Sequence, residues 1–160
     1  GLVPREGLLR LGGDGRGARI TACSPRFPEV PWNCIAREKR FRFILVSPGL
    51  FLGGWLLPGC RMEDGELLWE HQGMRARLAA ASVGRQEVVS GWDLALRRPK
   101  TALRAVPPGS VYWLEDFEGE MEALRRVVET GLWDSANLDE LGPRRAEGFN
   151  GVIVAAWPKT

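Results

Sequence analysis

Basic residues, in two cases interleaved with glycine, gather in three stretches of this chain. The stretches are GGDGRG at residues 12–17, RRPK at residues 97–100 and RRAEGFNG at residues 144–151. Glycine lets main-chain N–H groups approach a ligand closely, and the arginine side chain matches a phosphate with two parallel hydrogen bonds. We therefore expect contact with a phosphate-bearing polymer, although each stretch alone is also typical of a surface turn. The candidate binding residues are Arg16, Arg97, Arg98, Lys100, Arg144, Arg145, Gly148, Phe149 and Gly151.

Phe149 lies between two glycines in the third of these stretches. Two arginines, an aromatic ring and flanking glycines could clamp a single-stranded nucleic-acid backbone and stack one base on the ring. Phe149 could equally fill the core beneath its loop, with Gly148 and Gly151 only permitting an unusual loop conformation. The sequence leaves both interpretations open.

Catalytic and metal-binding side chains are sparse. His71 is the only histidine, so mechanisms that need two are excluded, and as a general base it would need an oriented partner. Its surroundings, EHQG at residues 70–73, indicate a loop. Cys23, Cys34, Cys60 and His71 form a possible zinc set, but their spacing lacks the paired-cysteine knuckle of zinc sites. We therefore predict no catalytic residue, no metal site and no cofactor.

Composition indicates one globular domain. The chain has 160 residues, 44% of them hydrophobic and 26% charged, which suits a single core. Residues 1–42 carry nine Arg or Lys against four Asp or Glu, while the remainder is net negative. This basic segment could meet phosphate or form a solvated surface. Three cysteines favour a reducing compartment, and the sequence shows neither an apolar run of about 18 residues nor a signal peptide. We expect a cytoplasmic protein without membrane contact.

Hydrophobic periodicity and turn residues predict the order of elements. The predicted elements are an apolar piece at 8–11, a strand at 18–22, a loop at 23–39, a strand at 41–47 buried on both faces, a degenerate helix at 50–57, a loop at 58–66, a hairpin of strands 75–83 and 86–92 turning at Gly84-Arg85, a basic connection at 93–109, a strand at 111–114, a helix at 118–130 and a strand at 151–157.

With the hairpin counted as an insertion, this order approximates β-α-β-β-α-β, the ferredoxin-like plan of an α+β fold. We expect residues 1–160 to form one domain, with residues 1–40 a basic, loop-rich arm and residues 41–157 the ferredoxin-like core. The helix would cover one face of the sheet and leave the other free for a ligand or partner. The acidic run at residues 115–122 should face solvent or a basic partner.

Several long stretches carry a family resemblance. GLLRLGGDGRGAR, FILVSPGLFLGGWLLPG, SGWDLALRRPK followed by RAVPPGSVYW, and EGFNGVIVAAW occur in this order between about residues 7 and 157. Together they resemble the C-terminal half of the third subunit of the type III-B (Cmr) CRISPR effector complex, a RAMP-superfamily protein. The EGFNG segment is similar to the glycine-rich loop near the C-terminus of RAMP proteins.

The resemblance implies a modified ferredoxin-like fold and a non-catalytic role in antiviral defence. It implies binding to the 5′-tag region of the guide (CRISPR) RNA. It also implies contacts with the large polymerase/cyclase-like subunit, with the backbone RAMP subunit and with an N-terminal part of the same protein. Two alternatives stay open. One is a metal-independent endoribonuclease that processes guide RNA, with His71 in its site. The other is a pure protein adaptor without RNA contact.

Overall fold

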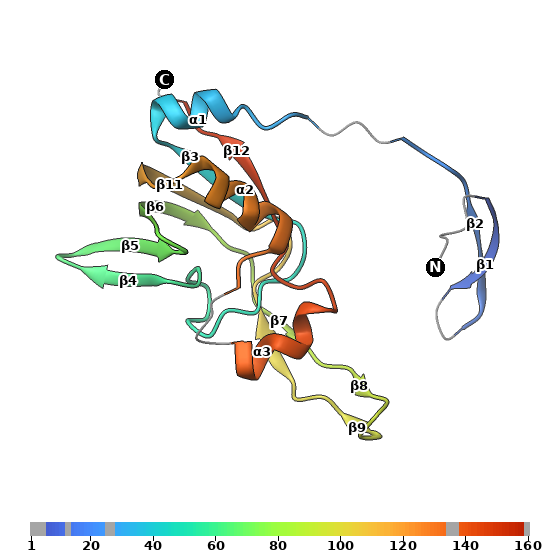
Figure 1. Cartoon of the computed structure of the whole chain (residues 1–160). Coiled ribbons are helices and arrows are strands. Elements are labelled where there is room, and N and C mark those ends of the chain that lie inside the picture. Colours follow the sequence, from blue (N-terminus) through green and yellow to red (C-terminus); the bar gives the residue numbers. More distant parts are fainter. Residues whose placement is uncertain (1–5, 12–13, 25–27, 134–137, 159–160) are drawn as a thin grey trace.

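The chain folds around one antiparallel sheet (Figure 1). The computed structural model describes residues 6–11, 14–24, 28–133 and 138–158. In spatial order the strands of the six-stranded sheet are β12 (Val152–Ala156), β3 (Phe41–Leu45), β11 (Val111–Glu118), β6 (Met74–Ser82), β5 (Glu66–His71) and β4 (Cys60–Glu63). The fold is therefore α+β, as predicted.

The remaining described elements lie outside this sheet. The helices are α1 (Trp32–Glu38), α2 (Met121–Thr130) and α3 (Leu138–Arg145). Three small two-stranded ladders pair β1 (Gly7–Leu11) with β2 (Arg16–Ile20), β7 (Glu87–Val89) with β10 (Leu103–Ala105), and β8 (Trp92–Asp93) with β9 (Arg98–Pro99). The β1–β2 hairpin stands apart from the sheet in Figure 1, and none of its described side chains belongs to either apolar cluster.

One face of the sheet carries the principal core. Phe41, Phe43 and Leu45 alternate along β3 with half-buried residues, so the strand buries one face more deeply than the other. The prediction that this strand is buried on both faces is wrong. The physical reason is that the helices pack on one side only, so Arg42 and Ile44 on the opposite side remain partly open.

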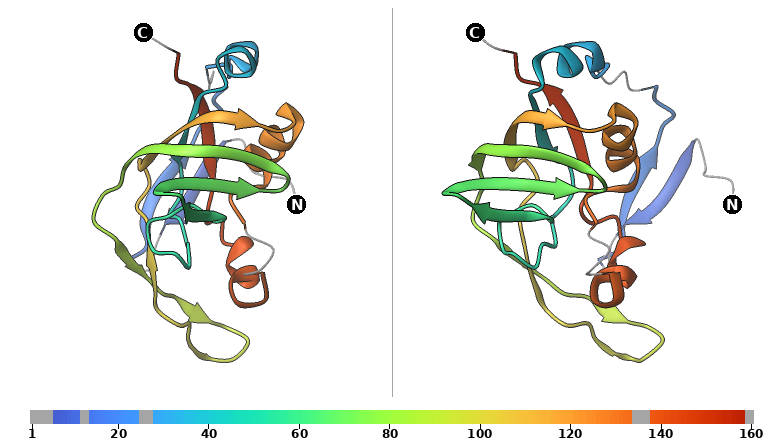
Figure 2. Two further views of the ribbon diagram at one scale, coloured as in Figure 1. Left: turned by 90° about the vertical axis from the view of Figure 1, so that its left-hand side faces the viewer. Right: turned by 60° about the vertical axis from the view of Figure 1, so that its left-hand side comes forward.

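The helix α2 closes this core. Its residues Ala123, Leu124 and Val127 are buried and belong to the principal core. Both views of Figure 2 show this helix, in orange, beside the sheet. Edge-to-face contacts link Phe41 to Phe43, with ring centroids 5.0 Å apart, and Phe43 to Trp69 at 5.4 Å. The helix predicted at 118–130 is confirmed, and it begins at Met121 because Glu120 has an extended backbone.

Other predicted elements are corrected by the structure. The predicted loop at 23–39 contains α1, whose Ile35 is fully buried in the principal core. The predicted loop at 58–66 contains β4, which turns into β5 at Asp64-Gly65. Both turn residues have positive φ, 50° and 85°, as a type I′ hairpin turn requires. Asp-Gly is a strong hairpin signal, and the sequence reasoning missed it.

The predicted hairpin between 75–83 and 86–92 does not form. Strand β6 pairs with β5 and β11, whereas β7 pairs with β10. The physical reason is that Ala76 and Leu78 of β6 are buried in the principal core, and β5 and β11 occupy both edges of this strand. Gly84-Arg85 therefore lies in a connection rather than in a tight turn.

Strand order follows from two crossovers. Consider the strands β3, β6, β11 and β12 as the first to fourth in chain order. In the sheet the fourth strand lies beside the first, the first beside the third, and the third beside the second. The crossover from β11 to β12 contains α2 and α3. The crossover from β3 to β6, all of it described, contains turns and the β4–β5 hairpin instead of the helix predicted at 50–57. Gly53-Gly54 lies in these turns, and glycine disfavours helix.

Candidate nucleic-acid interface

A cavity of about 600 Å³ opens between the β8–β9 hairpin and α3. Its walls include Arg98 and Lys100 from the second basic stretch and Arg144 from the third. The other lining residues are Asp93, Leu96, Pro99, Thr101, Leu103, Leu141, Pro143 and Glu147. The fold thus brings together two stretches that are far apart in the sequence, while Arg16 of the first stretch is not among the lining residues.

Arg144 lies inside this arrangement rather than on its surface. The residue is only 6% exposed. Its Nη1 donates to the Ser90 carbonyl at 3.1 Å and to Glu147 Oε2 at 3.0 Å, and its Nη2 donates to the Thr101 carbonyl at 2.9 Å. Ser90 and Thr101 flank the β8–β9 hairpin, so Arg144 ties both ends of the hairpin to α3. This position differs from the outward one expected of a phosphate contact.

Lys100 is also engaged with the protein. Its Nζ lies 2.5 Å from Glu147 Oε1, and its main-chain N–H donates to the Gly91 carbonyl at 2.8 Å. Glu147 therefore accepts from Lys100 and from Arg144, and these two cations hold the pKa of its carboxyl below the usual range. The Glu147 carboxylate offsets part of the positive charge in the cavity and fixes both cations.

Three arginines beside the cavity remain available. Arg97 and Arg98 lie at the tip of the β8–β9 hairpin, and Arg145 lies at the end of α3; all three are exposed. None of them forms an ion pair with a described acidic side chain. The tip itself is ordered by Asp93, whose Oδ1 accepts from the Leu96 N–H at 2.9 Å. Beside this cavity, the cations most accessible to a ligand are therefore these three.

The glycine-rich loop at residues 146–151 is built around Asn150. This residue is 1% exposed and has a left-handed backbone, with φ 63°. Its Oδ1 accepts from the Leu50 N–H at 2.6 Å, and its Nδ2 donates to the Leu132 carbonyl at 2.9 Å. Sequence reasoning did not single out Asn150, although an Asn-Gly pair is a known marker of such turns.

The flanking loop residues have different roles. A side chain at Gly151 would place its Cβ 2.9 Å from Ser47 Oγ, which is the atom that accepts from the Gly151 N–H. Gly151 is therefore required for close packing. Gly148 has φ +83° and open space around it. Phe149 is half-buried and packs against the small cluster that contains Trp133, in agreement with the interpretation that it fills the core beneath its loop.

The candidate binding residues lie in a part of the chain that matches a known protein family. The chain matches the family model described as CRISPR-associated protein (Cas_Cmr3) over residues 3–157. The chain belongs to this family. The predicted resemblance to the third subunit of the type III-B complex is thus confirmed, and all the candidate binding residues of this Cmr3-family chain lie within the matched range. No curated protein matches the chain.

His71 of this Cmr3-family chain lies at the end of β5, not in a loop as predicted. It is 6% exposed, and its ring stacks on Trp69 with centroids 5.7 Å apart and planes 20° apart. The possible zinc ligands are dispersed, since the described residues include no group of three or more metal-ligand side chains. No helix in the described part of the chain is long and apolar enough to cross a membrane.

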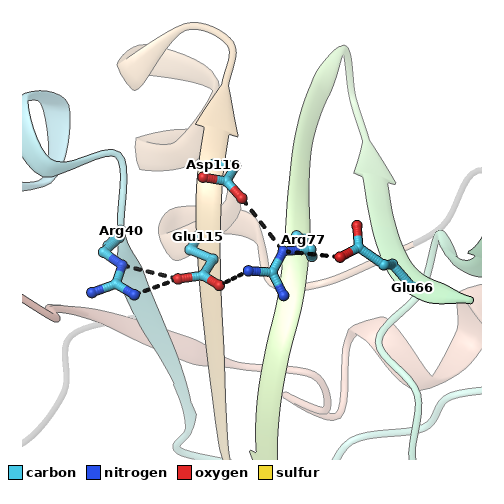
Figure 3. Close-up of polar contacts among 5 residues, drawn as sticks. All are labelled: Arg40, Glu66, Arg77, Glu115 and Asp116. Atoms are coloured by element: carbon cyan, nitrogen blue, oxygen red, sulfur yellow. Dashed lines mark hydrogen bonds and ion pairs between the residues drawn. The ribbon is translucent and has the colours of Figure 1, made fainter.

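The opposite face of the sheet carries a network of paired charges. Glu115 on β11 is 8% exposed and lies between Arg40 and Arg77 (Figure 3). Arg40 Nε donates to Glu115 Oε2 at 3.0 Å, and Arg77 contacts Glu115, Asp116 and Glu66. The expectation that the acidic run faces solvent or a partner is wrong for Glu115, because the chain's own arginines bury it. Arg40 and Arg77 therefore differ from the arginines of the hairpin tip, which lack acidic partners among the described residues.

Proposed function

We propose that this Cmr3-family chain is a non-catalytic subunit of a type III-B CRISPR complex that binds the backbone of guide RNA. The observation that carries this proposal is the position of Arg97, Arg98 and Arg145. Arg98 lines the cavity beside α3, and Arg97 and Arg145 are exposed neighbours in sequence of its lining residues Arg98 and Arg144. All three lack described acidic partners, whereas Arg40 and Arg77 on the opposite sheet face are paired with Glu115. Uncompensated arginines attract phosphate groups from solution.

In the proposed mechanism, Arg97, Arg98 and Arg145 contact successive phosphates without reading the base sequence. Arg144 and Glu147 act as positioning residues that hold the hairpin against α3. Lys100 exchanges its contact with Glu147 for a phosphate when RNA enters the cavity. Gly148, in open space, leaves room for the sugar–phosphate chain, and the exposed part of the Phe149 ring is available to a base.

The finer assignments belong to the same proposal. The strand order β12-β3-β11-β6 and the α2 crossover support a modified ferredoxin-like fold of the RAMP type, with residues 1–160 as one domain and the β1–β2 hairpin with Arg16 as a basic arm. We infer that the bound segment is the 5′ tag of the guide and that the protein acts in the cytoplasm in antiviral defence.

Protein partners are inferred from the same hairpin. Its side chains Trp92, Leu94 and Leu96 are 56%, 85% and 60% exposed. Apolar side chains gathered at one tip are typical of a protein–protein contact. We propose that they meet a neighbouring subunit of the complex, the large polymerase/cyclase-like subunit or the backbone RAMP subunit. The N-terminal part of the same protein would contact another surface.

The test measures the salt dependence of RNA binding. The variant carrying Arg97→Ala, Arg98→Ala and Arg145→Ala is compared with the unmodified chain, using a fluorescent single-stranded RNA with the tag sequence. Each phosphate contact to a single strand contributes about 0.7 to the slope of log K against log salt, so losing three should reduce the slope by about 2. Arg126→Ala, which removes an exposed cation from α2, is the matched control. An unchanged slope in the triple variant would refute the proposal.

A further inference from the structure

A second surface of the molecule combines an aromatic ring with free cations. One cavity, of about 610 Å³, is lined by Gly54, Trp55, Ala81, Val83, Gly84 and Gln86. A second cavity, of about 390 Å³, is lined by Arg85, Gln86, Val88 and Arg104. The two cavities share Gln86, so an aromatic and apolar wall adjoins a basic wall. None of these residues lines the cavity beside α3.

Trp55 is presented by a loop that the core holds in place. Its side chain is partly open, the residue being 43% exposed. Its main-chain carbonyl accepts a 2.6 Å hydrogen bond from the hydroxyl of Tyr112, a side chain that is fully buried in the principal core. The preceding Gly54 has φ +74°, a conformation that favours glycine. The backbone that carries the ring is therefore held in place by the core.

The basic wall is uncompensated. Arg85 and Arg104 are both exposed, and neither forms an ion pair with a described acidic side chain. Arg104 lies opposite Val88 in the β7–β10 ladder, and Val88 is 71% exposed. By contrast, the exposed Arg61 on β4 pairs with Glu63 and Glu70. Two free guanidinium groups near a shared amide side chain are suited to an anion rather than to an apolar partner.

We propose that this surface binds one nucleotide of single-stranded RNA. The base stacks on Trp55, the Gln86 amide hydrogen-bonds the base edge, and Arg85 and Arg104 hold the adjoining phosphate. Stacking on an aromatic side chain tolerates any base, because every base has a π-face. This proposal rests on the proposed function, since it assigns a second contact point to the same RNA. It places that contact on a different surface from the hairpin tip.

The test uses the whole chain and a short oligouridylate containing 5-iodouridine as the probe. Trp55→Ala should weaken binding roughly tenfold, as expected for loss of one stacked base, whereas Trp55→Phe should keep most of the affinity. The double variant Arg85→Ala with Arg104→Ala should lower the salt slope by about 0.7 for the one phosphate they share. Ultraviolet irradiation should crosslink the probe to the peptide that contains Trp55.

The outcomes separate this proposal from the first one. If Trp55→Ala binds RNA normally while the triple variant at the hairpin tip and α3 loses affinity, this proposal is overturned and the proposed function stands. If both sets of variants bind normally, both proposals fail. A crosslink from position 55 to a protein subunit in the assembled complex, without any crosslink to RNA, also overturns it. Circular dichroism of each variant verifies that the fold is retained. If Trp55→Ala unfolds, the double variant Arg85→Ala with Arg104→Ala decides: an unchanged salt slope overturns the proposal.

Discussion

Replacing Arg144 by Ala should release the β8–β9 hairpin without removing a phosphate contact. The guanidinium donates to the carbonyls of Ser90 and Thr101 and to Glu147. Hydrogen bonds from a charged group contribute about 1.5 kcal/mol each at the lower end of their range, which gives about 3 kcal/mol for the two carbonyls. The pair with the partly exposed Glu147 adds at most about 1 kcal/mol. The hairpin contact should therefore weaken by about 3 kcal/mol.

Hydrogen exchange measures this loss directly. The Lys100 amide donates to the Gly91 carbonyl within the hairpin, so its exchange reports opening of the hairpin. A loss of about 3 kcal/mol corresponds to exchange faster by about a hundredfold. The amide of Glu70, which donates to the Gly59 carbonyl beside β4, should be unaffected and serves as the internal reference.

RNA binding then distinguishes a positioning role from a phosphate contact. In Arg144→Ala the affinity should fall because the hairpin tip is no longer held, but the salt slope of the remaining complex should not change. Arg144→Lys restores the charge but not the forked geometry, so it should not restore slow exchange. A slope reduced by about 0.7, with hairpin exchange unchanged and with rescue by Lys, would refute the reasoning.

Three further predictions concern other parts of the chain. The pKa of Glu147 is lowered in the folded protein. Its contribution to holding the hairpin should therefore be complete above about pH 4.5 and be lost as pH falls through the lowered pKa. Amide hydrogen exchange of residues 90–101, measured as a function of pH with Glu147→Gln as the control, tests this. Glu115→Ala leaves two arginines without their shared partner and should destabilise the fold by about 3 kcal/mol in urea unfolding. Burial raises the pKa of Cys60 to about 11, so at pH 8 iodoacetamide should label the exposed Cys23 well before Cys60; equal rates would contradict the packing around Cys60.

Local patterns in the amino-acid sequence determined several elements of the fold. The apolar stripe and charge order of residues 118–130 predicted α2 because a helix repeats its faces within a few residues. The runs at residues 41–47 and 151–157 predicted strands that correspond to β3 and β12 for the same local reason. The basic stretches at 97–100 and 144–151 were recognised as binding candidates from residue type alone, and the family followed from the longer stretches around them.

Only the tertiary structure decided which strands pair and which arginines are free. Strand partners such as β6 and β11 are set by long-range burial, which no local turn signal encodes. Arg144 and Arg145 are adjacent in sequence and identical in type, yet Arg144 is buried against the hairpin and Arg145 is exposed. The difference arises because neighbouring residues of a helix point in different directions, and only the packing of α3 against residues 90–101 determines which of the two faces inward.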